Sequence, residues 1–365
     1  MELLTLPQLT FKGSVTAIGE AHGCELRAQI RDFVPMRFAA TLDYLRALGH
    51  SDVGPLVDVG RRCLDVYARW HPQGHAEHCA IARGAGVDAA ELYTAANMTD
   101  MRDVLALGDM PELHGGLPAD AEGCTAVLIP PAFAQSGHAI AAQTWDLNPQ
   151  DLDFVVAIHR VPDDGPATWS VTCTGCLSLV GMNDRGLAVG TTNIKTLGSR
   201  IGIGYMGVLH RMLASRDFAE AARVCETAPR AAAHTYWLAS PAQLAEWETT
   251  AWSAVRRDAV QGPTGRTNHC LVAQHAQRQG EPPSASSQAR LARVEERLRA
   301  DAPHDAASLR AIFADRQDGV DSINRFAEDG EGTSTNSVVI AVPATRTLWA
   351  CRGSADRGEW VELIL

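Results

Sequence analysis

The sequence predicts an α+β fold in which antiparallel sheets pack under helices. Three observations lead to this class. The first hundred residues repeat their apolar side chains at helical spacing, a loop rich in glycine and proline follows at 108–123, and short apolar runs dominate after it. These short runs are joined by hairpin-like turns and not by helices, so the pattern disfavours a doubly wound parallel sheet.

The part before the loop is mostly helical in pattern. Residues 24–48, 53–70 and 88–107 each repeat apolar side chains with a period near 3.6. Pro35 lies inside the first of these segments, and proline lacks the amide hydrogen that a helix needs. We therefore expect a kink or two separate helices there. The loop is the best boundary in the chain, between a helical part, 1–123, and a strand-rich part, 124–365.

The part after Gly123 alternates strands with pairs of helices. Helical pairs are expected at 203–228 and at 288–300 with 305–316, and a polar loop at 276–287. The expected strands lie at 124–129, 138–145, 154–161, 168–173, within 177–194 as a hairpin, and at 234–240, 246–256, 335–342, 346–352 and 358–364.

Composition excludes several classes of protein. The chain has 365 residues, a formal net charge of −11 and no run of 18 apolar residues. Nucleic acids and anionic membranes bind clusters of lysine and arginine, so the acidic balance argues against both as the main partner. No transmembrane helix is predicted, and the opening residues lack the regions of a signal peptide. Nine cysteines, an odd number, suit a reducing compartment, so we expect a cytoplasmic protein.

Cys124 is the first candidate for chemistry. It follows Gly123 at the end of the breaker loop and opens an apolar strand. If the peptide bond before it were cut, one residue would carry both a thiol and an α-amine with a pKa near ~8, low enough to take the thiol proton. Gly123 has no side chain to block attack on its own carbonyl. The alternative is a buried structural cysteine, which is common in protein cores.

Two polar sites in apolar surroundings are the next candidates. Asp146 ends an expected strand, where a carboxylate must find donors or lie at the rim, although it also suits the start of a turn. Asn268 stands at an expected strand edge, where its amide can donate to a developing oxyanion, and His269 follows it. A turn residue explains Asn268 equally well.

Five segments, in order, resemble the acyl-coenzyme A:6-aminopenicillanic acid acyltransferase (isopenicillin N acyltransferase) family of N-terminal-nucleophile hydrolases. They cover most of the chain. They are Gly13-x5-Gly19-x2-His22-Gly23 with Leu26-Arg27 and Ile30, then Gly123-Cys124-Thr125, Gln143-Thr-Trp-Asp146, Gly181-Met-Asn183-x2-Gly186-Leu-Ala-Val, and Thr267-Asn268-His269-Cys270.

The resemblance implies an αββα sandwich formed by a zymogen that cuts itself before Cys124. Fragments 1–123 and 124–365 then stay associated as one unit. Cys124 would be the nucleophile, Asn268 with a backbone N–H would hold the oxyanion, and Asp146 would orient the amine or the substrate. The implied activity is that of an amidase or acyltransferase, with hydrolysis and transfer both open. Candidate pocket residues are Thr125, His269, Thr335 and Ser337, although packing in a strand explains the last two equally well.

One departure from the family pattern concerns the substrate. The penicillin-forming members carry Ser-Arg-Gly before the third-last strand, where this chain has Glu331-Gly-Thr-Ser-Thr335 and no arginine. A penicillin-like anionic substrate is therefore disfavoured. We expect a small amide or thioester as substrate, no cofactor and no metal, and the oligomeric state, including a homo-oligomer, is left open.

Two alternatives belong to other classes. His75, His78 and Cys79, or the pair Cys173 and Cys176, would make the chain a metal-binding or redox protein, although neither set has a second ligand pair nearby. The second alternative is a catalytically inactive binding module of the same fold. The joint presence of Cys124 and Asn268 counts against it.

Overall fold

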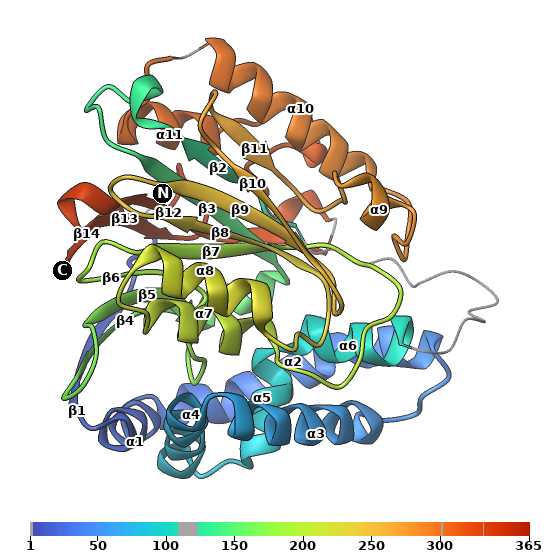
Figure 1. The fold of residues 1–365 in the computed structure, drawn as a ribbon. Helices are drawn as coiled ribbons and strands as arrows, with labels where there is room; N and C mark the ends of the chain where they lie inside the picture. Colours follow the sequence, from blue (N-terminus) through green and yellow to red (C-terminus); the bar gives the residue numbers. More distant parts are fainter. Residues whose placement is uncertain (1–2, 109–122, 301, 331) are drawn as a thin grey trace.

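Two sheets lie face to face in the computed structural model, and helices cover both outer sides (Figure 1). The structure describes residues 3–108, 123–300, 302–330 and 332–365. Most of the expected breaker loop, including Pro111 and Gly115, lies outside these residues. The prediction of an α+β fold with an αββα arrangement is confirmed.

The larger sheet has eight strands, in the order β1-β4-β5-β6-β7-β8-β9-β10. All its pairs are antiparallel except one: β1 runs parallel to β4, with Gln8 opposite Ala157. The sequence analysis expected no strand there, because β1 buries only Phe11 and gives little alternating signal. The strands are β1 (Gln8–Gly13), β4 (Val155–Pro162), β5 (Thr168–Cys173), β6 (Val180–Asn183), β7 (Ala188–Asn193), β8 (His234–Ala239), β9 (Leu244–Thr249) and β10 (Ala254–Asp258).

The smaller sheet has six strands, in the order β11-β2-β3-β12-β13-β14, and all its pairs are antiparallel. Its central strands β2, β3 and β12 are buried almost throughout, which explains their continuous apolar runs. The strands are β2 (Ala126–Ile129), β3 (Ile140–Leu147), β11 (Thr264–Arg266), β12 (Ser334–Val342), β13 (Thr347–Arg352) and β14 (Val361–Ile364).

Helices form the two outer layers (Figure 1). α10 (Ala285–Ala300) and α11 (Ala306–Phe313), preceded by the short α9 (Ala273–Ala276), lie on the side of the six-stranded sheet. The helices on the other side are α1 (Val15–Glu25), α2 (Arg27–Ala47), α3 (Gly54–Trp70), α4 (Pro72–Ala85), α5 (Ala89–Ala96), α6 (Met98–Leu107), α7 (Tyr205–Leu213) and α8 (Phe218–Thr227).

Two helix predictions need correction. We expected a kink or two separate helices at Pro35; α2 is one continuous helix with Pro35 inside it, so two separate helices are excluded and the kink stays a prediction. The helix expected at 88–107 is instead two helices, α5 and α6, which meet at Asn97. The side chain of Asn97 donates to the carbonyl of Tyr93 and accepts from the amide of Met206. This competition with the backbone ends the first helix.

α1 and α4 pack closely because glycines line their contact. A Cβ at Gly23 would lie 2.1 Å from the carbonyl oxygen of Ile81, and one at Gly84 would lie 2.5 Å from that of Glu20. This close approach fixes α4 against the sheet, where Glu77 accepts a 2.7 Å bond from Arg160 on β4.

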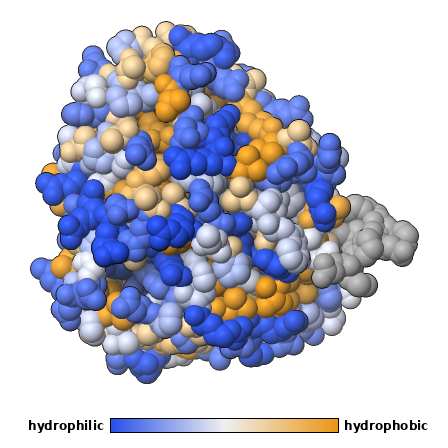
Figure 2. All heavy atoms as spheres, viewed as in Figure 1, coloured by the Kyte–Doolittle hydropathy of each residue, from blue (hydrophilic) through white to orange (hydrophobic). Residues whose placement is uncertain are grey.

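The face seen in Figure 2 is largely hydrophilic, with apolar residues in separate groups. Within the described ranges, no helix has both the length and the hydrophobicity to cross a membrane.

We expect His22, on α1, to make stability depend on pH. Burial and then Arg160 lower its pKa from 6.5 to about 3, and its Nε2 accepts from the amide of Gly175. Below pH 6.5 the unfolded chain takes up a proton that the folded chain refuses until about pH 3. The contribution of His22 to the free energy of unfolding is therefore fully present above pH 6.5. Below pH 6.5 it falls by about 1.4 kcal/mol per pH unit.

Urea unfolding at pH 7.5 and pH 5 measures this dependence. His22→Gln should reduce the slope of the unfolding free energy against pH by the amount that corresponds to about one proton. The same substitution at the exposed His138 should leave this slope unchanged. Equal slopes for wild type and His22→Gln would contradict the expectation.

Candidate active site

The peptide bond between Gly123 and Cys124 lies beside β3, just before β2 begins. The amide of Gly123 donates to the carbonyl of Asp146 at 3.1 Å, and the amide of Asp146 donates back to the carbonyl of Gly123 at 2.9 Å. The amide of Cys124 donates to Oδ1 of Asn268 at 2.8 Å. Both polar atoms of this peptide bond are therefore held in place.

Asn268 is positioned by the first turn of α10. Its backbone amide donates to Oγ of Ser287 at 2.9 Å, and its Nδ2 donates to the carbonyl of Asn193 at 2.9 Å. The orientation of its side-chain amide is fixed, because two donors face Oδ1 and a carbonyl faces Nδ2. The second hydrogen on Nδ2 remains for another acceptor.

Arg290, one turn along α10, reaches the same point. Its guanidinium donates to the carbonyl oxygen of Cys124, to Oγ1 of Thr125 at 3.1 Å and to Oδ1 of Asn268 at 3.0 Å. Burial lowers its pKa from 12.5 to about 10, while Asp146 works in the opposite direction. The group therefore stays charged at neutral pH. Sequence reasoning missed Arg290.

Asp146 is fully buried on β3, and neither of its carboxylate oxygens has a hydrogen-bond partner among the described residues. Burial raises the pKa of its carboxyl, and the nearby charges of Arg290 and Arg325 oppose that rise. A buried acid without such partners is costly to ionise. Asp146 is therefore suited to accept a new hydrogen bond from a group that appears at this place.

Charged side chains approach Gly123 closely. A Cβ there would lie 2.8 Å from Nη1 of Arg325 and 3.4 Å from both Nη2 of Arg290 and Oδ2 of Asp146. Two arginines and one aspartate thus surround the residue before Cys124.

A small cavity of about 30 Å³ opens beside Cys124. Its wall includes His234 on β8, whose Nε2 lies 2.5 Å from Oδ1 of Asp100, and Tyr205, whose ring stacks on His234 at 4.8 Å between centroids. Of the predicted site residues, Gly123, Cys124, Asp146 and Asn268 line it together. The complete lining is Thr99, Gly123, Cys124, Trp145, Asp146, Leu147, Leu179, Thr191, Asn193, Tyr205, His234 and Asn268.

The four candidate pocket residues do not line this cavity. Thr125 is buried under Arg290, and Nδ1 of His269 bonds Oγ of Ser287 at 2.8 Å. Thr335 pairs with Asp146 in the ladder and accepts from the amide of Arg325, whereas Ser337 is buried within β12. Thr125, His269 and Thr335 therefore contact the residues that surround Cys124 without lining the cavity.

Gln143 joins the two sheets behind the site. From β3 it donates to the carbonyl of Thr191 at 2.6 Å, and its Oε1 accepts from the amide of Thr191 at 3.0 Å and from Nε1 of Trp237 at 2.7 Å. This side chain fixes the distance between β3 and β7, the strand that supplies Asn193 to the cavity.

The metal and redox candidates gain no geometric support. Nε2 of His78 bonds the carbonyl of Ala89 at 2.8 Å and is thereby occupied, and only His75 approaches Cys79. Within the described ranges no three histidine, cysteine or acidic side chains are grouped to hold a metal ion. Burial raises the pKa of both Cys173 and Cys176, which disfavours the thiolate that redox chemistry needs.

The family model described as "AAT: Acyl-coenzyme A:6-aminopenicillanic acid acyl-transferase" matches residues 133–357, more than half of the chain. The chain belongs to this family. The match includes Asp146, Asn268 and Arg290 and begins after Cys124. The family resemblance is thereby confirmed, and the segments at 143–146, 181–189 and 267–270 lie within the matched residues, whereas the segments at 13–30 and 123–125 precede them.

Solved structures with a similar fold include three enzymes described as hydrolases or acylases. An N-acylethanolamine-hydrolyzing acid amidase ortholog from Caenorhabditis elegans is 13% identical, with a TM-score of 0.48, and 66% of this chain and 100% of that chain are covered. Penicillin V acylase from Agrobacterium tumefaciens is 15% identical, with a TM-score of 0.46, and 66% of this chain and 86% of that chain are covered. A mutant of conjugated bile acid hydrolase from Clostridium perfringens is 11% identical, with a TM-score of 0.46, and 66% of this chain and 92% of that chain are covered. No curated protein matches the chain.

Two arginines lie near Gly123 in this acyl-transferase family member, although the Ser-Arg-Gly step is absent from its sequence. Arg290 comes from α10, and Arg325 comes from the loop before β12. Glu331, within the departing segment, lies outside the described residues. Both arginines lie close to Gly123, but neither is among the residues that line the cavity at Cys124.

Replacing Gln143 by leucine should destabilise the fold. The change leaves the amide and carbonyl of Thr191 and the indole N–H of Trp237 buried without partners. We expect a loss of at least about 3 kcal/mol in the free energy of unfolding, measured by urea denaturation. Gln150→Leu, at an exposed position, is the matched control and should change it by less than about 0.5 kcal/mol.

Proposed function

We propose that this chain is a self-processing cysteine amidohydrolase or acyltransferase that acts on a small acyl or aminoacyl group through a Cys124 acyl-enzyme. The observation that carries the proposal is the peptide bond before Cys124, held at its carbonyl by Asp146 and at its amide by Asn268, in a member of an acyl-transferase family.

Self-cleavage begins at the Cys124 thiol. Its sulfur attacks the carbonyl carbon of Gly123, the peptide C–N bond breaks as a thioester forms, and the thiol proton passes to the released α-amine. One water molecule then hydrolyses the thioester, which leaves a carboxylate on Gly123 and a free thiol and amine on Cys124. The hydrogen bond from the amide of Asp146 polarises the attacked carbonyl.

Turnover reuses the same groups. The freed α-amine of Cys124 takes the thiol proton, and the thiolate attacks the carbonyl of an amide or thioester. Oδ1 of Asn268, already bonded to this nitrogen, orients the amine, and its second Nδ2 hydrogen serves the oxyanion. Asp146 is the acceptor for the ammonium that forms. Water or an amine then releases the acyl group.

The two fragments, 1–123 and 124–365, remain one unit in this proposal. β1 of the first fragment pairs with β4 of the second over six residues, and Glu77 of the first binds Arg160 of the second inside the fold. Cleavage before Cys124 breaks neither contact. The cytoplasmic location stays a prediction.

Denaturing mass spectrometry tests the processing step. Purified chain should give two fragments, 1–123 and 124–365, with Cys124 as the new N-terminus. Cys124→Ala should remain one 39.1 kDa chain without activity, whereas Cys124→Ser should cleave slowly, because a hydroxyl is the weaker nucleophile. An intact, active wild-type chain would contradict the proposal.

Asn268→Ala should slow both cleavage and turnover. Removal of one oxyanion donor typically costs about 10²–10³ in rate, and here the amide of Cys124 also loses its acceptor. The rate of fragment appearance after cell-free synthesis and kcat on a panel of aminoacyl amines, acyl amino acids and acyl thioesters measure the two effects. Wild-type rates in a folded Asn268→Ala chain would exclude the assigned role.

A further inference from the structure

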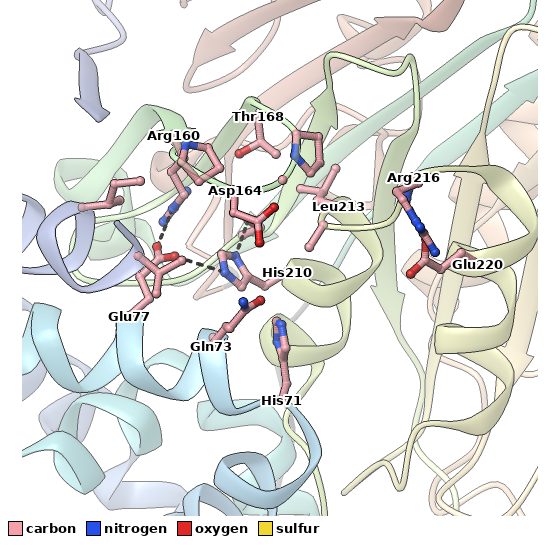
Figure 3. Close-up of a pocket in the computed structure, with 18 residues that line it drawn as sticks. His71, Gln73, Glu77, Arg160, Asp164, Thr168, His210, Leu213, Arg216 and Glu220 are labelled. Carbon is pink, nitrogen blue, oxygen red and sulfur yellow. Dashed lines mark hydrogen bonds and ion pairs between the residues drawn. The ribbon is translucent and has the colours of Figure 1, made fainter. Parts of the chain in front are cut away.

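A second cavity, of about 250 Å³, lies between the helix layer and the eight-stranded sheet (Figure 3). Arg160 of β4 and Thr168 of β5, which are partners across the ladder, contribute its sheet side. Its other walls come from α1, α4 and α7. It shares no lining residue with the cavity at Cys124, so it is a separate site.

Arg160 supplies a buried donor that the described residues leave unused. Its side chain is only 3% exposed; Nε donates to Glu77 at 2.7 Å and Nη2 donates to the carbonyl of Cys176 at 3.2 Å. Nη1 has no hydrogen-bond partner in the described part of the chain. Because a buried donor without an acceptor is unfavourable, a ligand oxygen at this atom would be stabilised.

A hydrogen-bonded chain makes this side of the cavity rigid. Oγ of Ser178 lies 3.0 Å from Nδ1 of His210, and Nε2 of His210 lies 3.3 Å from Oε2 of Glu77 (Figure 3). Burial opposes ionisation of Glu77, but Arg160 and His210 outweigh it and hold the pKa of its carboxyl well below the usual range. Glu77 therefore balances the charge of Arg160.

Besides Arg160 and Glu77, the cavity is lined by an ion pair, a neutral histidine and one carboxylate at the rim. Arg216 and Glu220 pair with each other at 3.2 Å, and burial followed by His210 lowers the pKa of His71 to about 3, so that ring is neutral. Asp164 is exposed on the rim, and its carboxylate makes no hydrogen bond or ion pair with the residues the structure describes. An ammonium group at the rim would therefore be stabilised by the carboxylate of Asp164.

Apolar side chains complete the lining. Ile18 of α1 and Leu213 of α7 are almost fully buried against it, and Val15, Pro162 and Pro166 extend this surface. A cavity of this size and composition fits a ligand with a short aliphatic side chain and few polar groups.

We propose that this cavity binds a small aliphatic amino acid or its amide. The carbonyl-type oxygen of the ligand accepts from Nη1 of Arg160, its ammonium group faces Asp164, and its side chain packs on Ile18 and Leu213. This site does not depend on the chemistry proposed for Cys124.

Isothermal titration of the full chain with L-leucine and with L-leucinamide tests the site. One of the two should bind with 1:1 stoichiometry, and the tighter one shows whether a free amino acid or an amide is the ligand. 4-Methylpentanoate, which lacks the amine, and isopentylamine, which lacks the oxygen, should each bind at least about tenfold more weakly, because each loses one charge-assisted bond.

Matched variants locate the binding. Asp164→Asn should weaken it about tenfold, whereas Asp163→Asn, at the adjacent exposed residue outside the lining, should leave it unchanged. Gln73→Trp, at an exposed position of the rim, should fill the cavity and abolish binding without loss of activity. Cys124→Ala should bind as wild type does, which separates this site from the catalytic one.

Four results would overturn the proposal. They are no saturable binding of either ligand, equal binding of the compound without an amine, binding that persists in Gln73→Trp, and binding that is lost in Cys124→Ala.

Discussion

The buried guanidinium of Arg290 is the interaction on which the rest of the site depends. It connects the helix layer of α10 to Cys124, two residues before β2, and to the side chain of Asn268. A charge in this position is tolerated only because its hydrogens have acceptors and because Asp146 lies nearby. The same requirement fixes the positions of Cys124 and Asn268 relative to each other. Stability and chemistry therefore use one set of contacts.

The fold was largely predictable because hydrophobic spacing changes from period 3.6 to short apolar runs at one place in the chain. β1 was missed because an edge strand that buries a single side chain has almost no alternating pattern. The division of 88–107 at Asn97 was missed for another reason. The side chain of Asn97 competes for the carbonyl of Tyr93 and binds the amide of Met206, and the second of these contacts exists only in the folded molecule.

The site divides in the same way. Gly123, Cys124, Asp146 and Asn268 stand in short segments whose order carries information, and they line one cavity. Arg290 gave no such signal, since α10 also contains Arg293, Arg297 and Arg299 on a helix with a largely polar composition. Only tertiary packing distinguishes the arginine that turns inward. The sequence motifs therefore gave no information about which arginine lies beside Cys124.

Neighbouring residues of one segment line the two separate cavities. Ser178 lines the cavity at Arg160, and Leu179, the next residue, lines the cavity at Cys124. Both residues come just before β6, and the amide of Leu179 is tied to Oγ of Ser170 on β5. A ligand in the outer cavity can influence the inner one only if it binds more tightly to one arrangement of this segment than to another. Ser178, His210 and Glu77 already join this segment to α7 and α4 by polar contacts, so a ligand that leaves these contacts intact would favour the arrangement in which Leu179 lines the inner cavity.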